Sequence, residues 1–301
     1  MVGTGALGGW YAGLLAGAGH DVSCLARRDA GVLKRDGVIL RDSNGERRAH
    51  FTQVAEVAST LGKFDIVIIA TKTTANAEIP GLVRTLAAPD ATLVTLQNGM
   101  GNAEVLASVA GSESVVAGLC FVCINRLAPG LIENSLAGHI RFAAAIGPAN
   151  ARVHAITALF KTAGVDARAD DSLESTLWRK LCWNIPFNGL SIAGGALTTD
   201  RILADPELAG RVRRLMLEVQ AAAAARGHPF STQHLEHQFT LTAAMGPYAP
   251  SSLIDFQTGK PVEVDAIWSL PLARGEGAGV AMPELRRLRD EILQCLAKRK
   301  N

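Results

Sequence analysis

The sequence has few cysteines and no surplus of either charge, and each scarcity excludes a class of protein. Its 5 cysteines among 301 residues are an odd number without dense spacing, which argues against a disulfide-rich secreted framework. Lys plus Arg number 30 and Asp plus Glu number 28, a formal net charge of +2. A dedicated nucleic-acid-binding protein normally carries a strong basic surplus, so we predict no nucleic-acid partner.

Long apolar runs are also missing. No stretch of about 18 residues is apolar without interruption, so we predict no membrane span and no membrane partner. The N-terminal segment is apolar and rich in glycine, but it lacks the basic residues that open a secretory signal peptide. Together with the cysteine usage, these features predict a soluble, cytoplasmic protein.

The chain does contain enough apolar material for a large core, since hydrophobic residues make up 48% of it and charged residues 19%. Up to about residue 170, strand-like runs alternate with Ala- and Leu-rich segments, which predicts βαβ units and a parallel sheet. The expected strands are 21–26, 64–71, 91–97 and 113–124, and the expected helices lie near 5–18, 76–88 and 101–110. The blocks 38–51 and 130–146 break this alternation and predict antiparallel strands added at the sheet edge.

The pattern changes to helical from Asp171 onward. The expected helices cover 172–192, 206–227 and 283–298. The length of the chain also favours two domains. We therefore predict an α/β Rossmann-type dinucleotide-binding domain, residues 1–170, followed by an all-α C-terminal domain, residues 171–301.

A G-x-G-x-x-G motif stands at Gly3, Gly5 and Gly8. In dinucleotide-binding proteins the first glycine makes a tight strand-to-helix turn, the second lets the pyrophosphate approach, and the third lets the helix pack on the sheet. An isolated match is also compatible with an ordinary glycine-rich turn, but the α/β pattern that follows favours a cofactor loop. The predicted cofactor-binding residues of this loop are Gly3, Thr4, Gly5, Ala6, Leu7 and Gly8.

Only Met1 and Val2 precede Gly3, whereas the first strand of such a domain normally supplies several residues. Either the sequence begins late or the strand is truncated. Because this strand is central in such sheets, a truncation should cost stability.

The end of the second predicted strand selects between NAD and NADP. An NAD enzyme usually places Asp or Glu there, about 20 residues after the glycines, to bind the ribose 2′-hydroxyl. This chain has Arg27 followed by Arg28, and a guanidinium suits a 2′-phosphate because it is a planar cation with several donors. We predict NADPH/NADP as the cofactor with Arg27 at its 2′-phosphate; the alternative is a solvated arginine without a role.

Lys180, Asn184 and Asn188 stand at positions i, i+4 and i+8 of a predicted helix, so they share one face. Their neighbours are mostly apolar, and burying a lysine and two amides is costly unless something pairs with them. A ligand would provide that pairing. Considered alone, the spacing also fits a solvated stripe without a role.

We predict no metal site. Cys120 and Cys123 lie in an apolar strand-like run, and no second pair completes a zinc site, so we assign them to the core. His234 and His237 are three residues apart without a third candidate ligand nearby in the sequence, which is typical of a solvated helix face.

A series of short motifs extends over nearly the whole chain. They are VGTGALGG (2–9), HDVSCLAR (20–27), ATKT (70–73), LQNGMGN (96–102), LWRKLCWNIPFN (177–188) and SSLIDFQTGKPVEVD (251–265). As an ordered set they resemble the ketopantoate reductase family, also called 2-dehydropantoate 2-reductase.

The resemblance implies a role for each matching residue. Lys180 matches the catalytic lysine, and Glu263 matches the carboxylate that holds the substrate hydroxyl. The residues that match the substrate site are Asn98, Asn184, Asn188, Ser251 and Glu263. Ser251 is chosen over Ser252 by aligning Asp255 and Glu263 with the family pattern.

On the cofactor side, Arg27 matches the residue that meets the 2′-phosphate, and Lys72 matches a lysine near the cofactor. Asn98 matches an asparagine beside the nicotinamide and the substrate. The chain also departs from the family at the positions Pro186, Thr198 and Trp268-Ser269. These departures border the expected substrate side and bear on which 2-keto acid is bound.

The resemblance implies an NADPH-dependent oxidoreductase of pantothenate biosynthesis that reduces 2-dehydropantoate (ketopantoate), or a related small-molecule 2-keto acid, to the 2-hydroxy acid. We expect Lys180 to act as general acid in a cleft between the two domains. The alternatives are another NAD(P)-dependent hydroxy-acid or opine-type dehydrogenase, or a non-catalytic NADPH-binding protein. Lys180 together with Glu263 favours the reductase. The apolar helical domain also leaves room for a homodimer interface.

Overall fold

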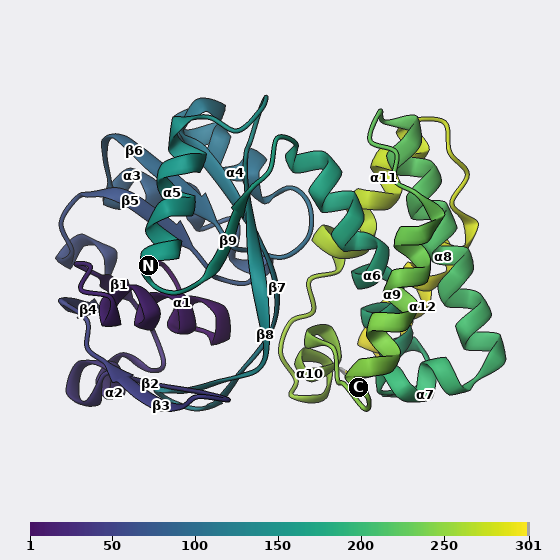
Figure 1. Cartoon of the computed structure of the whole chain (residues 1–301), viewed down its shortest axis with the longest axis horizontal. Helices are drawn as coiled ribbons and strands as arrows, with labels where there is room; N and C mark the ends of the chain where they lie inside the picture. Colours follow the sequence, from purple (N-terminus) through teal and green to yellow (C-terminus); the bar gives the residue numbers. More distant parts are fainter. Residues whose placement is uncertain (300–301) are drawn as a thin grey trace. The chain divides into compact units, whose positions relative to one another are not determined.

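The computed structural model describes residues 1–299, except for the side chain of Ala137, and it contains two compact units (Figure 1). The first unit comprises residues 1–98 and 102–173, and the second comprises residues 99–101 and those from 174 onward. The loop 99–101 therefore belongs with the second unit, although the predicted division at residue 170 placed it in the first domain. The last two residues of the predicted second domain lie outside the described residues.

The first unit, coloured purple to teal in Figure 1, combines a mixed sheet with helices, so the predicted α/β class is confirmed. Its strands are β1 (Ser23–Leu25), β2 (Val38–Asp42), β3 (Gly45–Ala49), β4 (Gln53–Ala55), β5 (Phe64–Ile69), β6 (Ala87–Thr95), β7 (Val115–Ala128), β8 (Leu131–Ala144) and β9 (Asp166–Ala169). Its helices are α1 (Ala6–Gly17), α2 (Ala30–Asp36), α3 (Ile79–Leu86), α4 (Asn102–Ala110) and α5 (Ala151–Thr162). Short 3₁₀ turns occur at Ala58–Thr60, Thr73–Ala75 and Ser112–Ser114.

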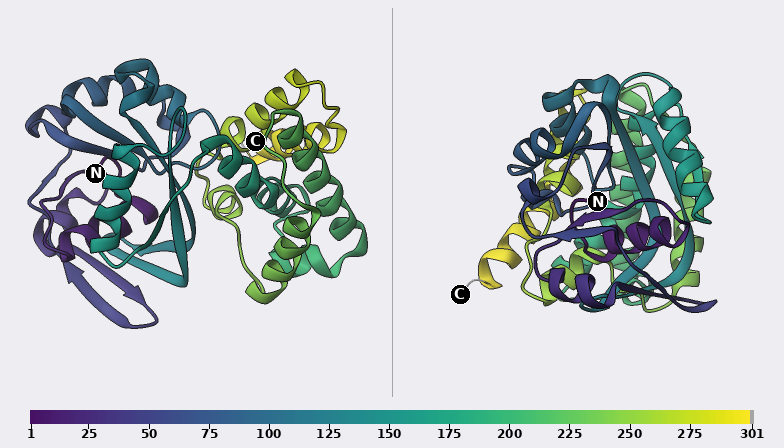
Figure 2. Two further views of the ribbon diagram at one scale, coloured as in Figure 1. Left: turned by 45° about the horizontal axis from the view of Figure 1, so that its top comes forward. Right: turned by 90° about the vertical axis from the view of Figure 1, so that its left-hand side faces the viewer.

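The main sheet has the strand order β3-β2-β8-β7-β6-β5, and β9 pairs with β8. Strands β5, β6 and β7 are parallel, whereas β8 runs antiparallel to β7. The prediction that residues 130–146 form a strand at the sheet edge is wrong, because β8 pairs with β2 and β9 as well as with β7. Its residues Ile140 and Phe142 are fully buried, which suits an interior strand. Strands β2 and β3 form an antiparallel hairpin at one end of the main sheet, where β2 also pairs with β8 (Figure 2).

Val2 alone occupies the position of a central strand. It forms parallel bridges with Leu25 of β1 and with Ile69 of β5. Its N–H donates to the Ile68 carbonyl at 2.7 Å, and its carbonyl accepts from the Ala70 N–H at 2.9 Å. The side chain is 2% exposed. One residue thus joins the β1–β4 pair to the main sheet and leads directly into the glycine loop.

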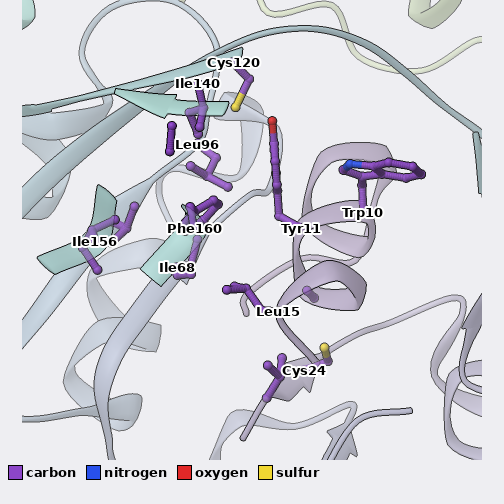
Figure 3. Packing of buried hydrophobic residues seen from close by; sticks show 14 of the residues in the cluster. Trp10, Tyr11, Leu15, Cys24, Ile68, Leu96, Cys120, Ile140, Ile156 and Phe160 are labelled. Carbon is purple, nitrogen blue, oxygen red and sulfur yellow. The ribbon is translucent and has the colours of Figure 1, made fainter. Parts of the chain in front are cut away.

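Helix α1 is anchored by an aromatic core. Tyr11 and Phe160 have ring centroids 5.4 Å apart, and Phe142 lies 4.8 Å from Phe160. Figure 3 shows the Tyr11 hydroxyl directed toward the sulfur of Cys120 in β7. Burial, and then the Cys120 thiol, raise the pKa of Tyr11 well above its usual value. This packing holds α1 firmly behind the glycine loop at its N-terminus.

The second unit is built of helices, so the predicted all-α domain is confirmed. Its helices are α6 (Leu173–Ala193), α7 (Thr199–Ala204), α8 (Pro206–Ala225), α9 (Thr232–Met245), α10 (Ser251–Gln257), α11 (Leu270–Gly277) and α12 (Pro283–Arg299), with a π-helical turn at Asp265–Ser269. Over residues 1–299, no helix combines the length and the apolar character that a membrane crossing requires.

Helix α6 supplies much of the core of the second unit, including the fully buried Trp178 and Phe187. Elsewhere in this core, buried Arg211 links α8 to α12 through ion pairs with Glu284 at 3.1 Å and Glu291 at 2.7 Å. The site residues predicted on α6 therefore stand on a helix that packs into the core of the second unit.

Candidate functional site

The three glycines of the N-terminal motif have different neighbours. Gly3 has a φ of +88°, and a Cβ there would lie 2.8 Å from Thr71 Cγ2. A Cβ at Gly8 would lie 2.0 Å from the Gly3 carbonyl oxygen. At Gly5, by contrast, a Cβ would meet nothing within 4 Å, and this residue is exposed. The fold therefore needs glycine at positions 3 and 8, whereas the open backbone at Gly5 leaves room for a ligand.

Gly5 is also the N-cap of α1 and so offers no side chain to the first turn. The first turn of this 12-residue helix contains no acidic residue. A helix N-terminus favours an anion because its backbone N–H groups and its dipole are both positive in character. The open backbone and the helix end together fit the pyrophosphate of a dinucleotide.

Arg27 lies just after β1 and forms an ion pair with Glu78, which precedes α3. The side chains of Arg27 and Glu78 are 71% and 52% exposed. Two residues after Arg27, Asp29 is buried and accepts a hydrogen bond from Arg126 of β7 at 2.6 Å. The buried Asp29–Arg126 pair thus holds the turn that carries Arg27, while the Arg27 guanidinium itself faces solvent.

A chain of side-chain amides connects the ends of β5 and β6. Gln97 Nε2 donates to Asn76 Oδ1 at 2.7 Å and lies 3.4 Å from the Thr71 hydroxyl. Asn76 Nδ2 in turn donates to Asn102 Oδ1 at 3.0 Å, and Asn102 Nδ2 donates to the Asn98 carbonyl at 3.0 Å. The network holds the backbone of Asn98, one of the predicted site residues.

Lys72, another predicted site residue, is exposed directly before the Thr73–Ala75 turn.

Sequence analysis did not identify Gln97, Asn76 and Asn102 as supporting residues. The available signal was that these amides lie within about five residues of the carboxyl ends of two predicted strands, where loops carry binding groups in α/β sheets.

Lys180, Asn184 and Asn188 all lie within α6, as the predicted spacing requires. Asn184 and Asn188 are 7% and 2% exposed, and Lys180 is half-buried. The alternative of a solvated stripe therefore does not fit the two amides. Asn188 Oδ1 accepts the backbone N–H of Ser252 at 3.1 Å, so this amide also holds the start of α10 against α6.

The two neighbouring serines differ in environment. Ser251 is exposed at the first position of α10, whereas Ser252 is 3% exposed and bonded to Asn188. Glu263 is 5% exposed and lies just before the π-helical turn Asp265–Ser269. The second unit thus buries a carboxylate and two amides, which is costly without polar partners.

Two of the departures from the family pattern, Pro186 and Trp268, are both buried in the second unit. Trp268 Nε1 donates to the Ile185 carbonyl at 3.0 Å, directly before Pro186, which has no N–H to continue the helix. A Cβ at Gly189 would lie 2.9 Å from the same indole nitrogen. Trp268 therefore fixes the stretch of α6 between Asn184 and Asn188. The third departure, Thr198, donates its hydroxyl hydrogen bond to Asp200 at the start of α7.

The π-helical turn also holds the loop that belongs to the second unit. The Met100 N–H donates to the Ala266 carbonyl at 2.8 Å. Gly99 has a φ of +81°, and a Cβ there would lie 2.4 Å from the same carbonyl oxygen. The glycine is therefore required by a close backbone approach.

Among the described residues, no three or more His, Cys, Asp or Glu side chains are grouped so that they could hold a metal ion. Cys120 and Cys123 are buried in β7, as predicted for core residues. His237 is exposed, but His234 is half-buried with its Nε2 3.2 Å from the Arg179 carbonyl oxygen.

Comparison with known protein families gives two matches. The family described as Ketopantoate reductase PanE/ApbA matches residues 1–147. The family described as Ketopantoate reductase PanE/ApbA C terminal matches residues 172–294. The two matches together cover most of both units.

Individual relatives agree with these matches. A 2-dehydropantoate 2-reductase of Nostoc sp. is 33% identical over 297 residues, which cover 97% of this chain and 93% of the relative. The crystal structure of 2-dehydropantoate 2-reductase from Geobacter metallireducens has a TM-score of 0.93 at 36% identity and covers 97% of this chain and 99% of its own. A ternary structure of D-mandelate dehydrogenase with NADH and anilino(oxo)acetate has a TM-score of 0.88 at 18% identity, covering 99% and 98% of the two chains. This last likeness concerns the fold alone.

Proposed function

Because the chain belongs to the ketopantoate reductase family and is therefore an oxidoreductase, we propose that it reduces 2-dehydropantoate, or a closely related 2-keto acid, to the 2-hydroxy acid. The observation that carries the proposal is the stripe formed by Lys180, Asn184 and Asn188 on a tightly packed helix. A cation and two amides in such surroundings suit a small anionic substrate with a polar carbonyl group.

Ketopantoate reductases use NADPH. In this chain the glycine loop would hold the pyrophosphate, Arg27 the 2′-phosphate, and Lys72 and Asn98 the part nearer the nicotinamide. The open backbone at Gly5 and the basic end of β1 support this assignment. When bound, NADPH supplies the hydride.

Lys180 acts as the general acid in this proposal. Hydride addition to the carbonyl carbon moves the electron pair of the C=O bond onto oxygen, and the Lys180 ammonium stabilises that charge and then donates a proton to it. The neutral amine regains its proton from solvent. Lys180 is half-buried, so its ammonium stays within reach of solvent for this reprotonation.

Asn184, Asn188 and Glu263 position the substrate. Amides donate and accept without adding charge, and a buried carboxylate accepts a hydrogen bond from a substrate hydroxyl. Ser251, which is exposed at the first position of α10, is the proposed partner of the substrate carboxylate, and its neighbour Ser252 is buried with its N–H bonded to Asn188. Glu263→Ala should chiefly raise KM for a hydroxylated 2-keto acid and matter less for one without the hydroxyl.

The direct test follows the loss of NADPH absorbance with a panel of 2-keto acids that includes ketopantoate. We expect the highest kcat/KM for ketopantoate or a similarly branched, hydroxylated acid. Turnover of amino acid plus keto acid pairs instead would favour the opine-type alternative. NADPH binding without turnover of any acid in the panel would favour a non-catalytic NADPH-binding protein.

Arg27→Ala tests the cofactor assignment. It should weaken NADPH binding by tenfold or more and NADH binding little, because only NADPH has the 2′-phosphate. Equal weakening of both cofactors would remove Arg27 from the 2′-phosphate site. A homodimer also stays a prediction, which sedimentation of the purified protein would test.

A further inference from the structure

The ion pair between Arg27 and Glu78 joins two segments that are 51 residues apart in the sequence. Arg27 stands after β1, and Glu78 stands directly before the first residue of α3. The contact joins Nη2 of the exposed Arg27 guanidinium to Oε2 of Glu78. A carboxylate therefore already lies against one of the donor groups that an anionic ligand of Arg27 would use.

Both partners stand on backbone that the interior of the first unit fixes. On the Arg27 side, buried Asp29 is held by Arg126 at 2.6 Å. On the Glu78 side, Asn76 is held by Gln97 and Asn102 at 2.7 and 3.0 Å. The fold thus holds the segments that carry the two residues near each other.

We propose that Glu78 competes with the 2′-phosphate for Arg27 and so weakens this chain's preference for NADPH over NADH. The inference rests on the proposed role of Arg27. A guanidinium can give its best pair of parallel donors to one anion at a time. The 2′-phosphate must therefore displace Glu78 or share Arg27 with it.

Displacement and sharing both cost binding free energy. Displacement gives up the ion pair, and sharing brings a carboxylate close to a phosphate group of about −1.5 to −2 charges. Because the two side chains are 71% and 52% exposed, solvent screens both effects. Removing the carboxylate should therefore tighten NADPH binding by only about three- to tenfold. Ligands without the 2′-phosphate meet no such competition, so their affinity should not change.

The experiment measures binding to the full chain with 2′,5′-ADP and 5′-AMP as matched probes, besides NADPH and NADH. These probes isolate the phosphate and need no turnover. The variants are Glu78→Gln, Arg27→Ala and the double variant. The matched control is Glu46→Gln, since Glu46 is 51% exposed and pairs with Arg41 at 2.6 Å on the β2–β3 hairpin. Thermal unfolding of each variant verifies that it is folded.

We expect Glu78→Gln to tighten 2′,5′-ADP and NADPH about three- to tenfold, to leave 5′-AMP and NADH within about twofold, and to lose its effect in the Arg27→Ala background. The gain should shrink as salt is added. Glu46→Gln should change none of these affinities.

The inference is overturned if Glu78→Gln leaves 2′,5′-ADP binding unchanged or weakens it. It is also overturned if the gain persists without Arg27, or if Glu46→Gln gives the same gain. These outcomes leave the cofactor assignment standing as long as Arg27→Ala selectively weakens 2′,5′-ADP. If Arg27→Ala weakens both probes equally, the cofactor assignment itself fails.

Discussion

The two units handle their functional polar groups in opposite ways. The first unit exposes them: Gly5 has open space around its α-carbon, and Arg27 is 71% exposed in a surface ion pair. The second unit buries them: Asn188 and Glu263 are 2% and 5% exposed. Exposed charged groups interact weakly because solvent and salt screen them. A buried polar group stabilises the fold when it is hydrogen-bonded and destabilises it strongly when its partner is removed. On the proposed roles, cofactor preference depends on exposed side chains, whereas substrate recognition depends on side chains packed in the core of the second unit.

Replacing Lys180 should give the largest effect. Lys180→Ala should lower kcat by about 10²- to 10⁴-fold, because a positioned acid typically contributes that much. NADPH affinity should be retained, since the proposed cofactor residues belong to the first unit. The measurement is NADPH oxidation under saturating 2-keto acid, with NADPH fluorescence for binding.

Lys161→Ala, which removes an exposed lysine from the last turn of α5, is the matched control and should keep full activity. A Lys180→Ala protein with kcat within tenfold of the parent would contradict the assignment of Lys180 as general acid.

The glycines separate a folding role from a binding role within one motif. Gly8→Ala should lower the free energy of unfolding by about 3 kcal/mol or more, because its Cβ would lie 2.0 Å from a backbone oxygen that cannot move away. Gly5→Ala should leave stability nearly unchanged, since its Cβ meets nothing within 4 Å, yet it should weaken NADPH binding. Chemical denaturation and NADPH titration give the two quantities.

Gly17→Ala serves as the control in the same helix, because Gly17 is exposed and a Cβ there also meets nothing within 4 Å. It should leave NADPH binding unchanged and raise the free energy of unfolding by at most about 1 kcal/mol. Unchanged NADPH affinity in Gly5→Ala would show that the pyrophosphate does not approach this residue.

Asn188→Ala tests the buried polar groups of the second unit. Removing the amide leaves the Ser252 N–H, now 3.1 Å from Asn188 Oδ1, without its acceptor in a buried place. The free energy of unfolding should fall by about 1–3 kcal/mol, the usual cost of an unsatisfied buried donor. A variant as stable as the parent would contradict the role of Asn188 in holding α10. An unchanged KM for the 2-keto acid would contradict its proposed role in binding the substrate.

Local backbone chemistry is what the sequence predicts well. The helix expected over 206–227 is observed as α8, Pro206–Ala225. The prediction succeeds because single residues near each end of this helix determine where it begins and ends. Asp205 accepts from the Glu207 and Leu208 N–H groups, and Gly227 has a φ of +83°. The glycine loop was found for the same reason, since each of its glycines has a local backbone requirement.

Contacts between segments that are far apart in the chain could not be predicted from the sequence. Glu78 and Arg27 are 51 residues apart, and Trp268 and Ile185 are 83 apart, so no periodicity relates them. Strand β8 was placed at the sheet edge for the same reason: strand composition indicates a strand but does not name its neighbours. The predicted residues of α6 thus depend on a tryptophan that looked like a departure from the family pattern.

The smallest expected effect concerns pH and the two histidines of α9. His234 is half-buried, and burial lowers its pKa below 6.5. The hydrogen bond that His234 Nε2 donates to the Arg179 carbonyl opposes this shift, and the charges of Arg179 and His237 add to it. A histidine whose pKa is lowered by folding binds its proton more readily in the unfolded chain, so its contribution to stability is present above pH 6.5 and is lost as the pH falls below that value. Because the ring is partly solvated, the loss should be under about 1 kcal/mol. Thermal unfolding between about pH 5 and 8 should show a slightly smaller decline in Tm at low pH for His234→Gln than for the parent. His237→Gln, at the exposed position of the same helix, should decline as the parent does, and a steeper decline in His234→Gln would reverse the sign inferred for this residue.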